Sequence, residues 1–591
     1  MQDGQISSIS TARSAAAGGR AAQMCNHPWR FVRSALLIAL PIKLILVFSL
    51  PITADEAYYF IWGHFLSGGY YDHPPLIGWL LYLFQLLGAH PLSVRLPAVL
   101  LTPIVGCAIY AFLKREDAEK AALASCAFIL SPISLWSVLI ATDVPLLIFS
   151  FLSIVCVLQT LRSQNNAWCI AGGLCLGLAF LSKYFACLLA FSYGVYFLIL
   201  SPGRASLKRL AILAAGALPF LIQNLYWNYQ HGWPNLLFNL VNRNFFVTGL
   251  GYKNLLVYLL MLVYLVNPFF CWQLIRAFFS GLHGATMRSP YGPAAGSPPS
   301  LCDGDLLRPR RSPYCLRARS LCKLAEKCSR YKKSLSLRQP ALCFLGLPLL
   351  CFLALSSVRE IGLHWPLAFI LPVFIWAGLD LDKEKLKGAL RFTAWYGGLQ
   401  TLVLMLAFLL PLNVWQKLPL SSSAWHRLVY FFKHREIHAF LKGDSQHTVL
   451  AAPSYSDASL MFNDLGLYTV VFGEGSYHGR QDDLLTDFRA LNHRNFLIFY
   501  KRKPQLEAYQ PYFRKSELHR FTQYGARFYY VSGKDFQYPL YRDRVLRIIC
   551  LSYWRIPSWL PARGNFFSLK YFGNETCASG QSTGSSHTQA R

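Results

Sequence analysis

Carboxylates and imidazoles gather directly after the first apolar run of the sequence. The stretch "PITADEAYYFIWGHFLSGGYYDHPPLIGWLL" (51–81) contains Asp55, Glu56, His64, Asp72 and His73. A carboxylate held at a membrane face could act as a general base for a hydroxyl acceptor. A solvated loop start, anchored by the neighbouring interfacial tyrosines, would explain the same residues without any chemistry.

Two further polar residues interrupt apolar stretches. Asp143 lies in "IATDVPLL" and Lys183 in "GLAFLSKYFACLL". Asp143 could be an ordinary helix cap or a second carboxylate beside Asp55. Lys183 could be a snorkelling lysine or a cation that holds a phosphate near the membrane surface.

Cations and imidazoles also occur in two later stretches. Arg243 lies in "NLYWNYQHGWPNLLFNLVNRNFF", and Arg359 and His364 lie in "SSVREIGLHWPLAF". Ionisable groups at membrane depth are costly and are therefore functional candidates. Carboxylates mixed with cations indicate a substrate that combines a hydroxyl and a phosphate.

The composition indicates a multi-span membrane protein. Of 591 residues, 54% are hydrophobic and only 14% are charged, against about a quarter in soluble proteins. The net charge of +29 comes from Lys and Arg clustered between apolar runs, a pattern that fits the positive-inside rule better than nucleic-acid binding. The 16 cysteines form no C-x-x-C pair, which argues against a zinc ribbon.

Apolar runs predict roughly eleven membrane spans. The runs are 34–50, 94–113, 121–139, 144–161, 167–182, 184–200, 210–226, 255–275, 341–357, 366–379 and 392–412. The apolar segment 76–88 is short for a span and suits a helix lying at the interface.

The charge of the connections predicts the orientation. Basic or mixed segments at 114–120, 201–209 and 380–391 alternate with loops poor in Lys and Arg. The positive-inside rule then places the N-terminus in the cytoplasm and the loop 51–93 outside.

Composition also divides the chain. We expect a cytoplasmic tail (1–33), a transmembrane catalytic domain (34–413), an extracytoplasmic α/β domain (414–575) and a disordered tail (576–591). Residues 277–340 form an anomalous basic segment, which is either a disordered cytoplasmic loop or a local reading-frame disturbance.

Several motifs together resemble a known family. They are "ADEAYYFIWG", "GYYDHPPLIGWL", "ATDVPLL", "LSKY", "WNYQHGWPN" and "HWPL", with "YSDASLMFNDLG…GEGSYHGRQDDLLTDF" further on. The set is similar to the bacterial protein O-mannosyltransferase and aminoarabinose transferase group of the GT-C glycosyltransferases. The resemblance covers roughly 34–275 and 341–575.

The resemblance implies an inverting transfer of a sugar from undecaprenyl or dolichyl phosphate to a hydroxyl. Asp55 would be the base or the group that orients the acceptor, Glu56 would support it, and Asp143 would be the second acid. Cations offset the charge of the leaving phosphate. The donor-phosphate candidates are His73, Lys183, Arg243, Arg359 and His364.

The sequence departs from the family pattern at Asp72-His73. Some relatives have Glu-Lys or Arg-Lys before the paired prolines, and some bind a divalent ion through that acid and a later histidine. The corresponding "FNLVNRN" has no histidine, so the role of Asp72 as a metal ligand stays open. No other cofactor is expected.

The sequence leaves alternatives for both the acceptor and the class of protein. The first hypothesis is transfer to lipid A or the lipopolysaccharide core at the bacterial inner membrane, and the alternative acceptor is protein Ser/Thr. A lipid or sugar transporter or flippase would place ionisable groups near the midplane, often in repeated halves. The sequence shows no internal repeat, and its ionisable candidates gather at one face. A scaffold built around the C-terminal domain would tolerate mutation of 51–93.

Overall fold

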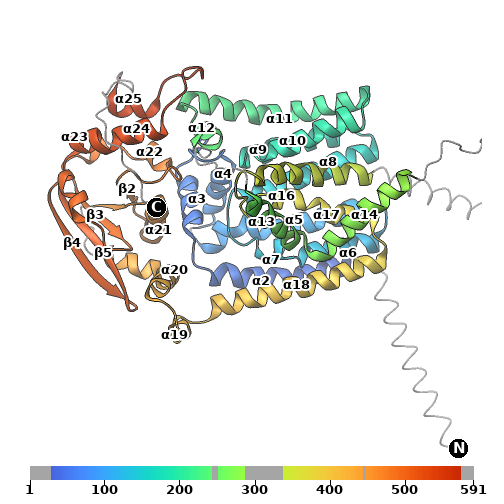
Figure 1. Ribbon diagram of the computed structural model, residues 1–591, viewed down its shortest axis with the longest axis horizontal. Coiled ribbons are helices and arrows are strands. Elements are labelled where there is room, and N and C mark those ends of the chain that lie inside the picture. The colour runs from blue at the N-terminus through green and yellow to red at the C-terminus, as the bar shows by residue number, and fades with distance from the viewer. Residues whose placement is uncertain (1–27, 89, 243–250, 287–336, 443–447, 574–591) are drawn as a thin grey trace, which may run out of the picture.

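The computed structural model describes residues 28–88, 90–242, 251–286, 337–442 and 448–573. Figure 1 shows a helical bundle joined end to end with a smaller domain that contains a β-sheet. We call residues 412–573 the C-terminal domain. Arg243, most of the anomalous segment 277–340, nearly all of the N-terminal tail and the final tail lie outside the described residues.

The bundle consists of apolar helices of very unequal length. Its helices are α2 (Trp29–Ser49), α5 (Pro91–Leu113), α6 (Ala118–Ile129), α7 (Pro132–Trp136), α8 (Asp143–Ser163), α9 (Asn166–Ser182), α10 (Ala186–Val195) with a π-helical turn (Tyr196–Leu200), α11 (Arg204–His231), α12 (Pro234–Leu240), α13 (Tyr252–Val266), α14 (Pro268–Thr286), Leu337–Ser356, α16 (Leu367–Ile370), α17 (Pro372–Asp380) and α18 (Lys383–Leu409).

Six of the described helices are long and apolar enough to cross a membrane. The bent pair α13 and α14, which meet at 102°, makes seven if it counts as one span. Four shorter apolar helices accompany them: Leu76–Gln85, Asn166–Ser182, Ala186–Leu200 and Leu367–Asp380. The chain is therefore a multi-pass membrane protein, although the predicted number of eleven spans is not confirmed.

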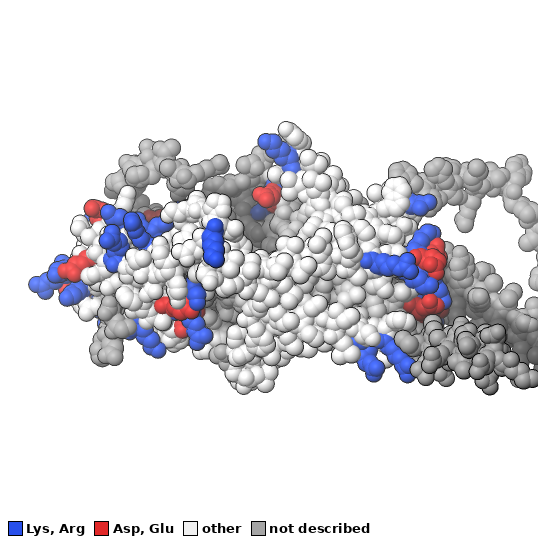
Figure 2. Space-filling model, turned by 90° about the horizontal axis from the view of Figure 1, so that it is seen from below, with Lys and Arg blue, Asp and Glu red and all other residues white. Residues whose placement is uncertain are grey.

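Charged residues lie mainly at the two ends of the molecule. On the face seen in Figure 2, a broad uncharged band separates the charges of the C-terminal domain from a cluster at the opposite end. Ion pairs hold that opposite end together, with Arg162 bound to Glu116 at 3.2 Å and Arg338 to Asp380 at 2.7 Å. The uncharged band is the part that suits a lipid environment.

The C-terminal domain has a five-stranded mixed sheet in the order β2-β1-β3-β5-β4. Its elements are α19 (Leu412–Gln416), α20 (Ser422–Leu441), β1 (Thr448–Ala452), α21 (Tyr455–Leu465), β2 (Val470–Val471), α22 (Gln481–Leu485), β3 (Asn495–Tyr500), β4 (Phe513–Gln523), β5 (Ala526–Phe536), α23 (Tyr538–Tyr541), α24 (Arg547–Tyr553) and α25 (Phe566–Phe572). The parallel pairs β1–β2 and β1–β3 adjoin the antiparallel pairs β3–β5 and β5–β4.

Helices cover both faces of this sheet (Figure 1). Successive side chains of β3 point to opposite faces, as the pleat requires. Phe496 and Ile498 pack in the cluster that includes α23 and α24, whereas Leu497 and Phe499 pack in the cluster that includes α20 and α21. The α/β character expected of this region is confirmed.

Helices α3 (Ala54–His64) and α4 (Leu76–Gln85) lie where the bundle meets the C-terminal domain (Figure 1). The backbone N–H of Tyr71 donates to Gln481 Oε1 at 2.8 Å, and the rings of Tyr58 and Tyr455 lie 5.0 Å apart. On the bundle side, a Cβ at Gly69 would clash with the indole of Trp227, so glycine is needed there. The loop 51–93 is thus fixed from both sides.

Candidate active site

A cavity of about 450 Å³ brings together five of the residues singled out in the sequence. Asp55, His73, Asp143, Lys183 and His364 all line it, although they come from five separate segments. Tyr59, Trp136 and Tyr264 contribute aromatic walls, and leucines line much of the remainder. A largely apolar cavity with a few convergent polar groups is typical of a small-molecule site.

Asp55 reaches the cavity because α3 starts at the residue before it. The Thr53 hydroxyl caps the helix by accepting from the backbone N–H of Glu56 at 3.3 Å, which places Asp55 in the first turn. Partial desolvation raises the pKa of Asp55, while a hydrogen bond from the Tyr455 hydroxyl (3.4 Å) acts in the opposite direction. A raised pKa suits a carboxylate that must accept a proton.

Asp143 and Lys183 form a buried ion pair at the side of the cavity. Lys183 Nζ donates to both carboxylate oxygens of Asp143, at 2.8 and 3.0 Å. Asp143 begins α8, and Lys183 directly follows the last residue of α9, so two adjacent helices position the pair. His364 Nε2 lies 4.0 Å from Asp143 Oδ2 on the cavity side. The pair therefore fixes the lysine ammonium at the cavity wall.

Glu56 lies outside the cavity, which argues against the catalytic role predicted for it. Arg95 Nε and Nη2 donate to its two carboxylate oxygens at 2.8 and 2.7 Å, and the N–H of Ile140 donates at 3.1 Å. Arg95 also donates to the carbonyls of Val47, Leu50 and Pro51. This fully buried pair ties the end of α2 to α3 and α5, a structural function.

The neighbours Asp72 and His73 point in different directions. His73 lines the cavity, whereas Asp72 Oδ2 accepts hydrogen bonds from the Tyr58 hydroxyl (2.9 Å) and the N–H of Gly479 (3.2 Å). Asp72 therefore joins the loop 51–93 to the C-terminal domain. Arg359 is not among the lining residues, and its guanidinium lies 5.2 Å from the centre of the Trp365 ring.

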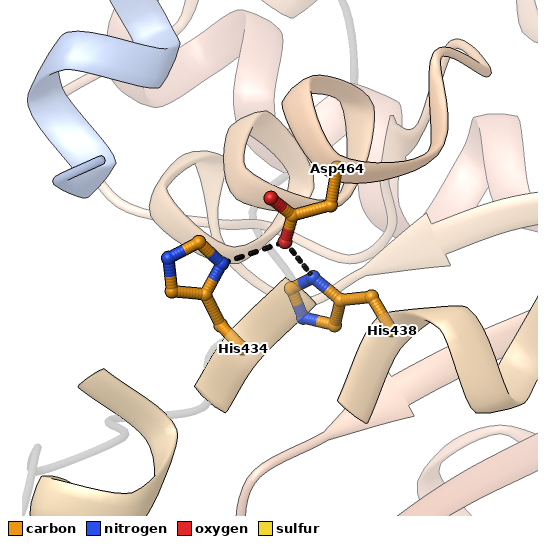
Figure 3. A group of neighbouring side chains, drawn as sticks. All are labelled: His434, His438 and Asp464. Atoms are coloured by element: carbon orange, nitrogen blue, oxygen red, sulfur yellow. Dashed lines mark hydrogen bonds and ion pairs between the residues drawn. The ribbon is translucent and has the colours of Figure 1, made fainter. Parts of the chain in front are cut away.

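Within the described ranges, three metal-capable side chains converge only at His434, His438 and Asp464, far from Asp72 in the sequence. Figure 3 shows the two imidazoles of α20 pointing at one carboxylate oxygen of α21, with Nδ1–Oδ2 distances of 2.7 and 2.6 Å. Ligand atoms around a tetrahedral zinc would be about 3.3 Å apart. The geometry is that of two hydrogen bonds, so no step of the chemistry is assigned to a metal.

This His–Asp–His cluster predicts acid-sensitive stability of the C-terminal domain. Burial lowers the pKa of His438. Burial of Asp464 acts to raise the pKa of that carboxylate, but the hydrogen bonds from His434 and His438 outweigh this effect and lower the pKa to about 2. Stability from His438 is complete above its unfolded pKa of about 6.5 and is lost as pH falls below it; stability from Asp464 is lost below about pH 4.

The measurement is thermal unfolding between pH 7.5 and 5. We expect the unfolding temperature to fall across this range in the wild type and to fall less in His438→Asn, which keeps an N–H donor without titrating. Equal slopes for the two proteins would contradict the assignment.

Sequence reasoning missed Tyr455 and Arg95 and did not assign Tyr59 to the site. Tyr59 lies four residues after Asp55, a spacing that puts both on one helix face. Arg95 is a single charge near the start of a long apolar helix, a signal of functional or structural importance. Tyr455 comes from a part of the chain 400 residues away, and no local signal reveals it.

Three similarities to known proteins bear on this arrangement. Residues 72–227, which include His73, Asp143 and Lys183, match the model of the family Dolichyl-phosphate-mannose-protein mannosyltransferase. A stretch of 208 residues is 30% identical to the lipid A galacturonosyltransferase RgtD of Rhizobium johnstonii, over 34% of this chain and 44% of that protein. The chain thus matches less than half the length of this relative.

The fold resembles solved structures over nearly their whole length. The crystal structure of ArnT from Cupriavidus metallidurans bound to undecaprenyl phosphate matches with a TM-score of 0.51 at 12% identity, covering 85% of this chain and 97% of that one. The apo form of the same protein matches with a TM-score of 0.50 at 13% identity. The resemblance inferred from the motifs is therefore confirmed in two respects: the chain has the fold of the solved ArnT structures, and part of it is similar in sequence to a family of sugar transferases.

Proposed function

We propose that this protein is an integral-membrane glycosyltransferase that moves a sugar from a polyprenyl phosphate to an acceptor hydroxyl on a lipid. The observation that carries the proposal is the convergence of Asp55, His73, Asp143, Lys183 and His364 on one cavity. A carboxylate with a raised pKa opposite a fixed cation is the pair of groups that this reaction needs.

In the proposed mechanism, the acceptor hydroxyl attacks the anomeric carbon of the donor while Asp55 takes its proton. A new bond forms between this carbon and the acceptor oxygen. The bond from the same carbon to the phosphate oxygen breaks, and its electron pair leaves with the polyprenyl phosphate. The attack comes from the face opposite the leaving group, so the configuration inverts.

Positive and hydrogen-bonding groups stabilise the departing phosphate. Lys183, held by Asp143, supplies the charge, and His73 and His364 line the same cavity as hydrogen-bond donors. A charge fixed in place before the reaction costs no reorganisation in the transition state. Arg359 is not among the lining residues, and its guanidinium lies against the ring of Trp365, so the same role is not assigned to it.

The comparisons support the choice of donor and acceptor. The structurally similar ArnT was crystallised with undecaprenyl phosphate, and the relative RgtD is a lipid A galacturonosyltransferase. We therefore propose undecaprenyl phosphate as the donor carrier and lipid A or the lipopolysaccharide core as the acceptor. The enzyme would lie in the bacterial inner membrane with its cavity and C-terminal domain on the extracytoplasmic side.

The test is transfer by purified protein in proteoliposomes. Radiolabelled undecaprenyl-phosphate sugars would be supplied with lipid A, with lipopolysaccharide core and with a Ser/Thr-rich peptide as separate acceptors. We expect label in lipid A or the core. Label in the peptide alone would replace the lipid acceptor with protein, and no transfer from any donor would refute the proposal.

Tyr455→Phe is expected to shift the acid limb of the pH–rate profile to higher pH. Its hydroxyl donates the hydrogen bond that lowers the pKa of Asp55, so removal lets that pKa rise further. A base works only when ionised, so more of the enzyme is then inactive at a given acidic pH. The measurement is kcat/KM against pH, with Tyr468→Phe as the matched control. An unchanged limb would contradict the coupling.

A further inference from the structure

A groove of about 840 Å³ lies in the C-terminal domain, outside the candidate active site. One wall is α20, through Arg427, Phe431 and His434. The facing wall is the segment 500–509, and the end is formed by residues 52–54 before and at the start of α3. We call this the basic groove.

Cations dominate the charge of the basic groove. Arg427, Lys501, Arg502 and Lys503 line it, together with His426. Asp457 is the carboxylate among its lining residues, and it is nearly fully buried. That carboxylate already accepts from Lys501 Nζ (2.9 Å) and from the hydroxyls of Tyr430 (3.0 Å) and Ser454 (2.9 Å). The exposed Arg502 and Lys503 therefore leave a net positive groove.

The other residues that line the basic groove are mainly apolar. The groove also lies close to the membrane. Ile52, Phe431, Leu460 and Pro504 give the groove a hydrophobic surface. The span α18 ends at Leu409 and α20 begins at Ser422, so little chain separates the groove from the bilayer. Cations on an apolar surface at this level fit an anionic amphiphile whose head group rises from the membrane.

The first turn of α3 separates the basic groove from the active-site cavity. Ala54 lines the groove and the next residue, Asp55, lines the cavity. A phosphate held by Arg502 and Lys503 would thus belong to a molecule whose other end can reach Asp55. The His434–Asp464 contact holds α20 against α21 and so keeps this wall in place (Figure 3).

We propose that the basic groove binds a phosphate group of the acceptor glycolipid and thereby presents its hydroxyl to Asp55. This inference rests on the proposed glycosyl transfer, because it names the acceptor subsite of that reaction. Phosphate recognition by paired cations would select phosphorylated acceptors over phosphate-free ones.

The test measures acceptor binding directly, without requiring transfer. Full-length protein in detergent would be titrated with bisphosphorylated lipid A and with the same lipid after phosphate removal. The variant is Arg502→Glu with Lys503→Glu. The matched control is Arg514→Glu with Arg520→Glu, two exposed cations on β4 that do not line the groove.

We expect the groove variant to bind bisphosphorylated lipid A at least about ten-fold more weakly than the wild type, because like charges then face the phosphate. Undecaprenyl phosphate should bind both proteins equally, and the control should bind the acceptor as the wild type does. Three results would each overturn the inference. The wild type could bind dephosphorylated lipid A as tightly as bisphosphorylated lipid A. The control variant could lose as much affinity as the groove variant, or phosphatidylglycerol at matched concentration could displace lipid A from the wild type.

The binding assay separates this inference from the proposed function. Phosphate-dependent binding of lipid A without any sugar transfer would refute the proposed glycosyltransferase activity but leave the proposed phosphate subsite in the basic groove standing. Normal transfer to bisphosphorylated lipid A by the groove variant, with normal affinity, would refute the groove and leave the glycosyltransferase.

Discussion

Replacement of Asp55 by asparagine is expected to reduce sugar transfer by at least about 100-fold, the usual contribution of a general base. Asparagine keeps the size and most of the hydrogen bonding of the side chain but cannot accept the proton. Because Asp55 lies at the N-terminus of α3 and is not part of a buried ion pair, the variant should fold normally. Undecaprenyl phosphate should bind as before.

The measurement is the initial rate of label transfer in proteoliposomes, with Glu474→Gln as a control at an exposed carboxylate of the C-terminal domain. A wild-type rate for Asp55→Asn would remove Asp55 from the mechanism. A loss of rate together with a loss of donor binding would instead assign it to donor recognition.

The second large effect is expected at the buried pair of Glu56 and Arg95. Their side chains are 1% and 0% exposed, and the N–O distance is 2.7 Å. Arg95→Met leaves the Glu56 carboxylate buried without its counter-charge, which typically costs about 3–5 kcal/mol of stability. We expect a lower unfolding temperature in detergent and a reduced yield of monodisperse protein.

A double variant distinguishes structure from catalysis at this position. Glu56→Gln combined with Arg95→Met removes both charges and should regain part of the stability lost in the single variant. If Glu56 also took part in the reaction, the double variant would regain stability without regaining activity.

Local sequence patterns were sufficient where the cause is local. The short apolar run "NFLIFY" and the helical pattern of "YSDASLMFNDLG" predict β3 and α21 correctly, because both faces of β3 are buried and α21 packs an apolar face against the sheet. The strand β4 was not anticipated, since its charged sequence "FRKSELHRFTQ" is an edge strand with much of its surface exposed.

In the candidate site too, residues with a local sequence signal were predicted, whereas contacts between distant parts of the chain were not. Charge in apolar surroundings was enough to nominate Asp143 and Lys183, which the structure brings into contact. Glu56 was nominated as a supporting residue, although Thr53-Ala-Asp-Glu56 is a capping-box sequence that marks it as a helix-start residue. The partners of Asp72 could not be foreseen, because Gly479 lies 407 residues further along the chain.

The hydrogen bonds between the loop 51–93 and residues 479–481 have a consequence for biogenesis. Tyr71 and Gln481 are 410 positions apart, so the loop leaves the ribosome long before its partner does. Asp72 and Tyr58 can reach their final contacts only after the last span has inserted and the C-terminal domain has folded on the same side. These contacts therefore form only after residues 479–481 have been synthesised, and a chain truncated before them would hold Asp55, Asp143 and Lys183 without the contacts that fix the loop 51–93.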